Sequence, residues 1–103
     1  ARHEVLCTLD DVVGQGARLL RPGGRFYMVH RPRRLVEIIA AFTRHGLEPK
    51  RMKMVHPYAD REANMVLIEA VRGGGPLLKM EAPVIVFDQN GEYSPEIRTT
   101  YGY

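Results

Sequence analysis

The stretch LLRPGGRFYMVH, residues 19–30, decides the fold of this chain. Pro22 cannot continue a helix, and the two glycines that follow it favour a turn. The residues after the turn, 25–30, are too apolar at their centre to alternate strictly, which indicates a short strand covered on both faces. The stretch therefore predicts a helix, a tight turn and a buried strand, as in an α/β sheet.

The segment before this turn has the pattern of an amphipathic helix. Thr8 can cap its N-terminus, with Asp11 three residues on in the capping-box position. The apolar positions recur at helical spacing and share one face: Leu9, Val12, Val13, Gly16, Ala17 and Leu20.

After the strand, Pro32 is expected to open a second helix. Its apolar stripe is Leu35, Ile38, Ile39 and Phe42. Gly46 is a natural residue to follow the helix end, and Pro49 prevents continuation. Two further strands are expected at 51–56 and 64–72, joined by a polar loop. The order helix, strand, helix, strand, strand predicts an α/β domain over residues 1–72.

The glycines at 73–75 and Pro76 mark a boundary, so residues 73–103 are interpreted as a linker and a C-terminal tail. The tail has one possible extra strand, at 83–87. Asn90-Gly91 is a strong turn signal. The tail also has an aromatic and basic group, Tyr93, Tyr101, Tyr103 and Arg98, which could bind nucleic acid and is interpreted mainly as an anchor of the tail.

The charge is uneven along the chain. Residues 1–72 carry 13 basic and 8 acidic side chains, whereas residues 73–103 carry 2 and 4. Of the 15 basic residues 12 are arginine, the side chain best suited to phosphate contacts and to stacking on bases. A basic body is compatible with nucleic acid, and a solvated surface explains it equally well.

Several classes of protein are disfavoured. The single cysteine, Cys7, excludes an internal disulfide, and the histidines lack the spacing of metal ligands. No apolar run approaches the roughly 20 residues of a membrane span, and no signal peptide is visible. We therefore expect a cytoplasmic protein that binds no metal and no membrane. The first residue, Ala1, suggests a processed product or a piece cut from a longer protein.

Several segments of the chain resemble a known protein family. The segment 19–29 resembles the helix, turn and strand before the fifth strand of class I methyltransferases. Residues 42–49 resemble the helix end before their sixth strand, and strands 51–56 and 64–72 resemble their final antiparallel pair. Three further segments, 1–4, 29–35 and 88–96, are similar to the C-terminal halves of the bacterial tRNA(Val) adenine-N6-methyltransferase family.

The resemblance implies the C-terminal half of a Rossmann-like methyltransferase sheet. The parent enzyme would use S-adenosylmethionine to methylate an adenine exocyclic amine in tRNA. The family's glycine-rich cofactor turn and its Asn-Pro-Pro-aromatic motif are absent here. We therefore expect no catalytic, cofactor-binding or metal-binding residue in this chain and no cofactor binding by it. The expected partners are RNA and the missing N-terminal half of the domain.

Candidate nucleic-acid-binding residues follow the ends of two strands. His30, Arg31, Arg33 and Arg34 come after strand 25–30, and ligands of open α/β sheets bind at the carboxyl ends of strands. Arg33 and Arg34 lie at a helix N-terminus, where positive charge is unfavourable. This unfavourable placement favours a functional role for the two side chains. The alternative is that these side chains are solvated at a helix start and bind no ligand.

A second candidate cluster lies in the loop after strand 51–56. Tyr58 could stack on a base and Arg61 could pair with a phosphate, while His56 ends the strand. If strands 25–30 and 51–56 are parallel, both clusters meet on one rim. An ordinary polar loop is the alternative. Arg2, His3 and Glu4 would follow the catalytic loop of the parent enzyme and contact it or the substrate, or form local ion pairs.

Two other functions fit the same residues. One is a methyltransferase of the same fold that acts on an rRNA guanine or a protein glutamine. The other is a non-enzymatic α/β interaction module. The resemblance also implies that the neighbour of strand 25–30 belongs to the missing half, so this strand would keep an apolar edge. We therefore expect self-association, most simply a two-fold dimer with the two 25–30 edges paired or with the tail strand 83–87 exchanged.

Overall fold

The structure, a computed structural model, describes residues 8–101. In chain order the elements are α1 (Leu9–Leu19), β1 (Arg25–His30), the 3-10 turn η1 (Pro32–Arg34), α2 (Leu35–Arg44), β2 (Leu47–His56), β3 (Met65–Arg72), β4 (Lys79–Met80), β5 (Val84–Ile85) and α3 (Pro95–Tyr101). The described part of the chain is a mixed α/β fold with five strands and three α-helices, so the expected fold class is confirmed.

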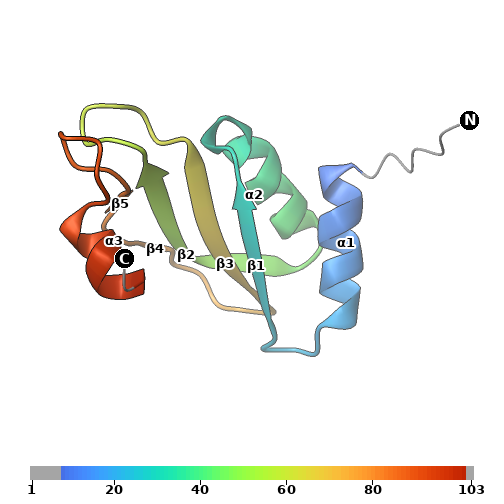
Figure 1. Ribbon diagram of the computed structural model, residues 1–103. Coiled ribbons are helices and arrows are strands. Elements are labelled where there is room, and N and C mark those ends of the chain that lie inside the picture. The colour runs from blue at the N-terminus through green and yellow to red at the C-terminus, as the bar shows by residue number, and fades with distance from the viewer. Residues whose placement is uncertain (1–7, 102–103) are drawn as a thin grey trace, which may run out of the picture.

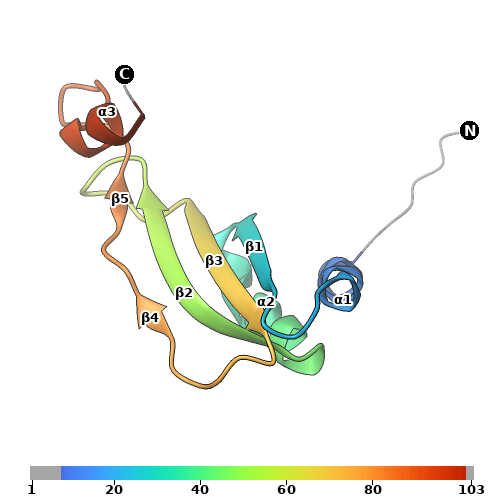
Figure 2. The same ribbon diagram turned by 90° about the horizontal axis from the view of Figure 1, so that it is seen from below.

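The sheet places β3 at its centre, between β1 and β2 (Figure 1). β3 is antiparallel to both of these neighbours, and β1 and β2 are therefore parallel to each other. The short strands β4 and β5 run parallel to β2 along its other edge. In Figure 2 the helix α1 lies beyond β1, at the opposite side of the sheet from β4 and β5.

The helix α1 begins as the sequence predicts. The Thr8 side chain accepts a hydrogen bond from the Asp11 N–H, and the Asp11 carboxylate accepts one from the Thr8 N–H, which completes the capping box. At the other end the Arg72 guanidinium donates to the carbonyls of Ala17 and Leu20, so that β3 holds the last turn of α1.

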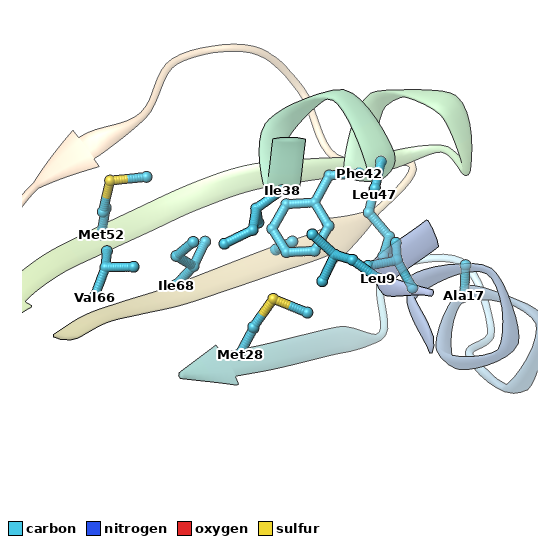
Figure 3. Close-up of a cluster of buried hydrophobic side chains, with 12 residues drawn as sticks. Leu9, Ala17, Met28, Ile38, Phe42, Leu47, Met52, Val66 and Ile68 are labelled. Carbon is cyan, nitrogen blue, oxygen red and sulfur yellow. The ribbon is translucent and has the colours of Figure 1, made fainter. Parts of the chain in front are cut away.

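The core lies between the two long helices and one face of the sheet (Figure 3). Phe42 and Ile38 of α2 are fully buried, and Val66 of β3 lies in the same cluster. Residues of β1, β2 and β3 alternate between this core and the opposite face, where Tyr27 is 66% exposed and Val29 is 54% exposed. The strand β1 is therefore covered on one face by the described residues, and the expectation of a strand covered on both faces is wrong for them.

Two element boundaries differ from expectation. The helix α2 starts at Leu35, because Pro32 opens a 3-10 turn first. The strand β2 starts at Leu47 and runs through Pro49, four residues earlier than predicted. A register shift between Pro49 and Arg51 explains this, because an irregularity in the ladder accommodates a residue that lacks an N–H donor.

The tail is more structured than predicted. Instead of one possible strand at 83–87 it has β4, β5 and α3. A small antiparallel bridge joins Phe87 to Tyr93 around the predicted Asn90-Gly91 turn. Ser94 is buried, and its hydroxyl donates to the Ile85 carbonyl at 2.6 Å. The tail thus returns to the sheet along the edge of β2 and leaves the outer edge of β1 without a strand among residues 8–101.

A glycine in α1 allows the helix to approach β1. A Cβ atom at Gly16 would overlap the ring of Phe26, which packs edge-on against Phe42 with a centroid separation of 5.8 Å. We expect Gly16→Ala to lower the free energy of unfolding by roughly 1–3 kcal/mol, because overpacking outweighs alanine's better helix propensity. Urea unfolding measures this change. The control is Gly75→Ala, where the added Cβ meets nothing within 4 Å. Equal midpoints for the two variants would contradict the packing argument.

Candidate nucleic-acid interface

The carboxyl ends of β1 and β2 lie at the same edge of the sheet. His30 and Met54 both pair with Val66, one from each side of β3. The two strands are parallel, as the convergence of the two candidate clusters requires. His30 and His56 are their last residues, and the segments that follow them form one rim.

A hollow of about 760 Å³ lies on this rim. Arg31 and Arg33 line it from the segment after β1, and His56 lines it from the end of β2. The remaining lining residues are Pro32, Met54, Glu62, Ala63 and Asn64. The structure therefore brings residues of both candidate clusters together. Within residues 8–101, neither arginine side chain has a hydrogen bond or an ion pair, so both cations are available to a ligand.

The free ring nitrogens of His30 and His56 have different hydrogen-bonding roles. The Arg31 N–H donates to Nδ1 of His30 at 2.8 Å, so a neutral His30 carries its proton on Nε2. Nδ1 of His56 lies 2.7 Å from the Arg61 carbonyl and donates to it, so a neutral His56 has Nε2 as an acceptor. One ring can thus donate a hydrogen bond to a substrate and the other can accept one.

Arg34 is separated from this group. Its guanidinium makes two hydrogen bonds to the Glu37 carboxylate in the first turn of α2. The hydrogen bond from Arg34 lowers the pKa of Glu37, and the same contact raises the pKa of Arg34. Glu37 offsets the unfavourable charge at the helix start, so the placement of Arg34 is weaker evidence of function than the sequence suggested. Arg34 lines a different hollow, along the outer side of β1.

Tyr58 and Arg61 lie on the other side of the hairpin loop 57–64. They line a second hollow, whose opposite wall is the tail. The Tyr58 ring packs against Phe87 at a centroid distance of 5.5 Å, a contact that the sequence did not indicate. Arg2, His3 and Glu4 lie outside the described residues.

Sequence reasoning also missed Glu62 and Asn64, which line the rim hollow beside Arg31. Their position depends on the path of the hairpin loop. The only signal in the sequence was their place, because Glu62 lies in the predicted polar loop and Asn64 is the first residue of the predicted strand 64–72. Asn64 donates its N–H to the Val55 carbonyl and so closes the loop.

The described residues do not fit S-adenosylmethionine. The connection from β1 to α2 contains Arg31, Arg33 and Arg34 and no glycine, and these arginines would repel the positive sulfonium of the cofactor. Gly73 follows β3, but residues 73–78 lead to coil and a short strand and not to a helix. Within residues 8–101 no group of three or more His, Cys, Asp or Glu side chains could hold a metal ion. None of the helices in that range is long and apolar enough to cross a membrane.

Comparison with known proteins gives a fold and no family. No family model matches the chain, and no curated protein matches it. One similar solved structure is the crystal structure of a predicted O-methyltransferase, protein Atu636 from Agrobacterium tumefaciens, with a TM-score of 0.81 and 22% sequence identity.

That likeness covers 91% of this chain and 45% of the Agrobacterium protein, so this chain spans less than half of its neighbour's length. At 22% identity the likeness concerns the fold alone, and the narrower resemblance to the tRNA(Val) adenine-N6-methyltransferases stays a prediction. The described chain therefore has a methyltransferase-like α/β fold, as residues 19–29 led us to expect.

Proposed function

We propose that this chain is the C-terminal half of an S-adenosylmethionine-dependent methyltransferase. Its target is an adenine exocyclic amine in a cytoplasmic tRNA, and the chain is inactive alone. The observation that carries the methyltransferase assignment is the likeness in fold, at a TM-score of 0.81, to a predicted O-methyltransferase more than twice as long as the aligned region. The order of β1, β3 and β2, with only β3 reversed, supports it.

The rim supports the choice of RNA as substrate. Arg31 and Arg33 are exposed cations without partners among the described residues, and they share a hollow with His56. Arginine is the side chain that best matches phosphate geometry. In our proposal the two arginines hold the RNA backbone, and the histidines offer one donor and one acceptor to nearby hydroxyls or base edges.

The described residues indicate which functions this chain and the rest of the proposed enzyme would each have. The groups that hold the cofactor and the target amine belong to the rest of the enzyme in this proposal. This half contributes three sheet strands, the two helices that cover them, and the RNA-facing rim. Methyl transfer to a base depends on bringing the base out of its stack and orienting it, to which a rim that fixes the backbone contributes.

We expect the isolated chain to bind S-adenosylmethionine negligibly, because its basic β1–α2 connection does not fit the cofactor. Calorimetric titration measures this affinity. The positive control is the protein translated from the complete reading frame that contains this chain. A dissociation constant at or below about 100 μM for the isolated chain would contradict the division of labour.

A further inference from the structure

The second hollow, between the hairpin loop and the tail, has about 650 Å³ of space. Tyr58, Asp60 and Arg61 line it from the loop. Phe87 and Gln89 line it from the tail, more than 25 residues later in the chain. The tail therefore completes a site that the hairpin alone does not form.

Two aromatic rings, those of Tyr58 and Phe87, line this hollow, and the Tyr93 ring packs on Phe87 outside the lining. The centroids of Tyr58 and Phe87 are 5.5 Å apart, with 35° between the ring planes. Those of Phe87 and Tyr93 are 5.6 Å apart and 20° from parallel. Aromatic rings that line a hollow form a platform on which a further planar group can stack.

Hydrogen-bonding groups surround the platform. The side chains of Asp60, Arg61 and Gln89 are exposed, and within residues 8–101 none of them makes a hydrogen bond or an ion pair. Together they offer a carboxylate acceptor, a guanidinium donor and an amide that is both. The Asp88 carboxylate, in contrast, accepts from the N–H groups of Asn90 and Glu92 and holds the turn.

The backbone fixes the walls of the hollow relative to each other. The Phe87 N–H donates to the Pro57 carbonyl at 2.9 Å, and the Val86 N–H donates to the His56 carbonyl at 2.9 Å. The Ser94 N–H donates to the Val86 carbonyl at 2.8 Å. A platform held in this way loses little conformational entropy when a ligand binds.

We propose that this hollow binds one unstacked nucleobase, with its face on the Tyr58 and Phe87 rings and its edge bonded to Asp60, Arg61 and Gln89. The inference rests on the proposed function and deepens it. His56 lines the rim hollow, and its ring bonds to the backbone of Arg61, which lines this one. A single-stranded RNA that crosses the hairpin loop can therefore place phosphates against Arg31 and Arg33 and insert a neighbouring base into the second hollow.

The test compares a short single-stranded RNA with the same RNA made abasic at every position, and with adenosine monophosphate as the free source of a base. Fluorescence anisotropy gives the affinity of each RNA for the full chain, and the backbone amide signals of Asp60 and Gln89 report the location for all three ligands. We expect the normal RNA to bind about tenfold more tightly than the abasic RNA. We expect this ratio to fall to about one in the triple variant Tyr58→Leu, Arg61→Ala, Gln89→Ala.

The control variant, Arg21→Ala with Gln15→Ala, changes exposed residues of the same kinds away from the hollow and should keep the tenfold ratio. Equal affinities of both RNAs for the unchanged chain would overturn the inference and leave the RNA-binding rim intact. Binding of adenosine monophosphate alone, lost in the triple variant, would support a base site and contradict the RNA substrate. If no ligand binds, the base site and the RNA-binding rim both fail.

Discussion

Replacing Arg31 and Arg33 together by alanine is expected to weaken the binding of single-stranded RNA by about a hundredfold at low salt. Each arginine would lose a charge-assisted contact with phosphate, which contributes roughly 1.5 kcal/mol, and about 1.4 kcal/mol is a factor of ten. The plot of log affinity against log salt should also become shallower by about 1.4, because each single-strand phosphate contact contributes roughly 0.7 to the slope. Anisotropy titrations at several salt concentrations measure both quantities.

The matched control is the double variant Arg21→Ala, Arg25→Ala. These two arginines are exposed and lie at the opposite, amino-terminal end of β1, so the net charge changes equally and the rim does not. Adding Arg34→Ala should have a smaller further effect, because Glu37 already pairs with that side chain. The same affinity and the same slope in the rim variant and the control variant would show that the rim does not bind RNA.

We expect the chain to self-associate through β1, and Val29→Lys to make it monomeric. No described strand pairs with the outer edge of β1, and the exposed apolar side chains beside it include Tyr27, Val29 and Val12. An unpaired apolar edge is a template for another strand, and a lysine on it opposes pairing. Of the two modes of dimerisation considered, edge pairing is favoured over tail exchange, because β5 already pairs with β2 of its own chain.

Light scattering at increasing protein concentration measures the association. Val36→Lys is the control, because Val36 is 85% exposed on α2 and not on the β1 edge, and this variant should associate like the unchanged chain. A monomeric unchanged chain at high concentration would rule out pairing through β1.

The parts of the fold that the sequence predicts well have short-range causes. The capping box joins residues three apart, and Pro22 with the glycines after it stops α1 before β1 can begin. The bounds of β1, 25–30, were therefore predicted without error. The stripe of α2 is similar, because helical spacing alone identifies Ile38 and Phe42 as core residues.

The parts that the sequence does not predict depend on distant partners. The strands β4 and β5 have two residues each, too few for any periodic pattern, and they exist because β2 offers them an edge. The early start of β2 has the same origin, since Leu47 pairs with Arg72 at the far end of β3.

The candidate site divides in the same way. The convergence of Arg31 and His56 followed from the parallel arrangement of two strands, which the order of elements suggests. The Arg34–Glu37 pair has a spacing of three residues, so it was visible in the sequence and was overlooked. The contact of Tyr58 with Phe87 was not predictable, because it requires the fold of the tail.

The most direct test is to express the protein encoded by the complete reading frame that contains this chain, and to measure transfer of a labelled methyl group from S-adenosylmethionine to tRNA. The proposal predicts label in N6-methyladenosine and a strong reduction of the rate at limiting tRNA in the Arg31→Ala, Arg33→Ala variant. A folded full-length protein that binds S-adenosylmethionine but labels no tRNA would contradict the tRNA substrate. One that neither binds S-adenosylmethionine nor transfers its methyl group would contradict the methyltransferase assignment itself.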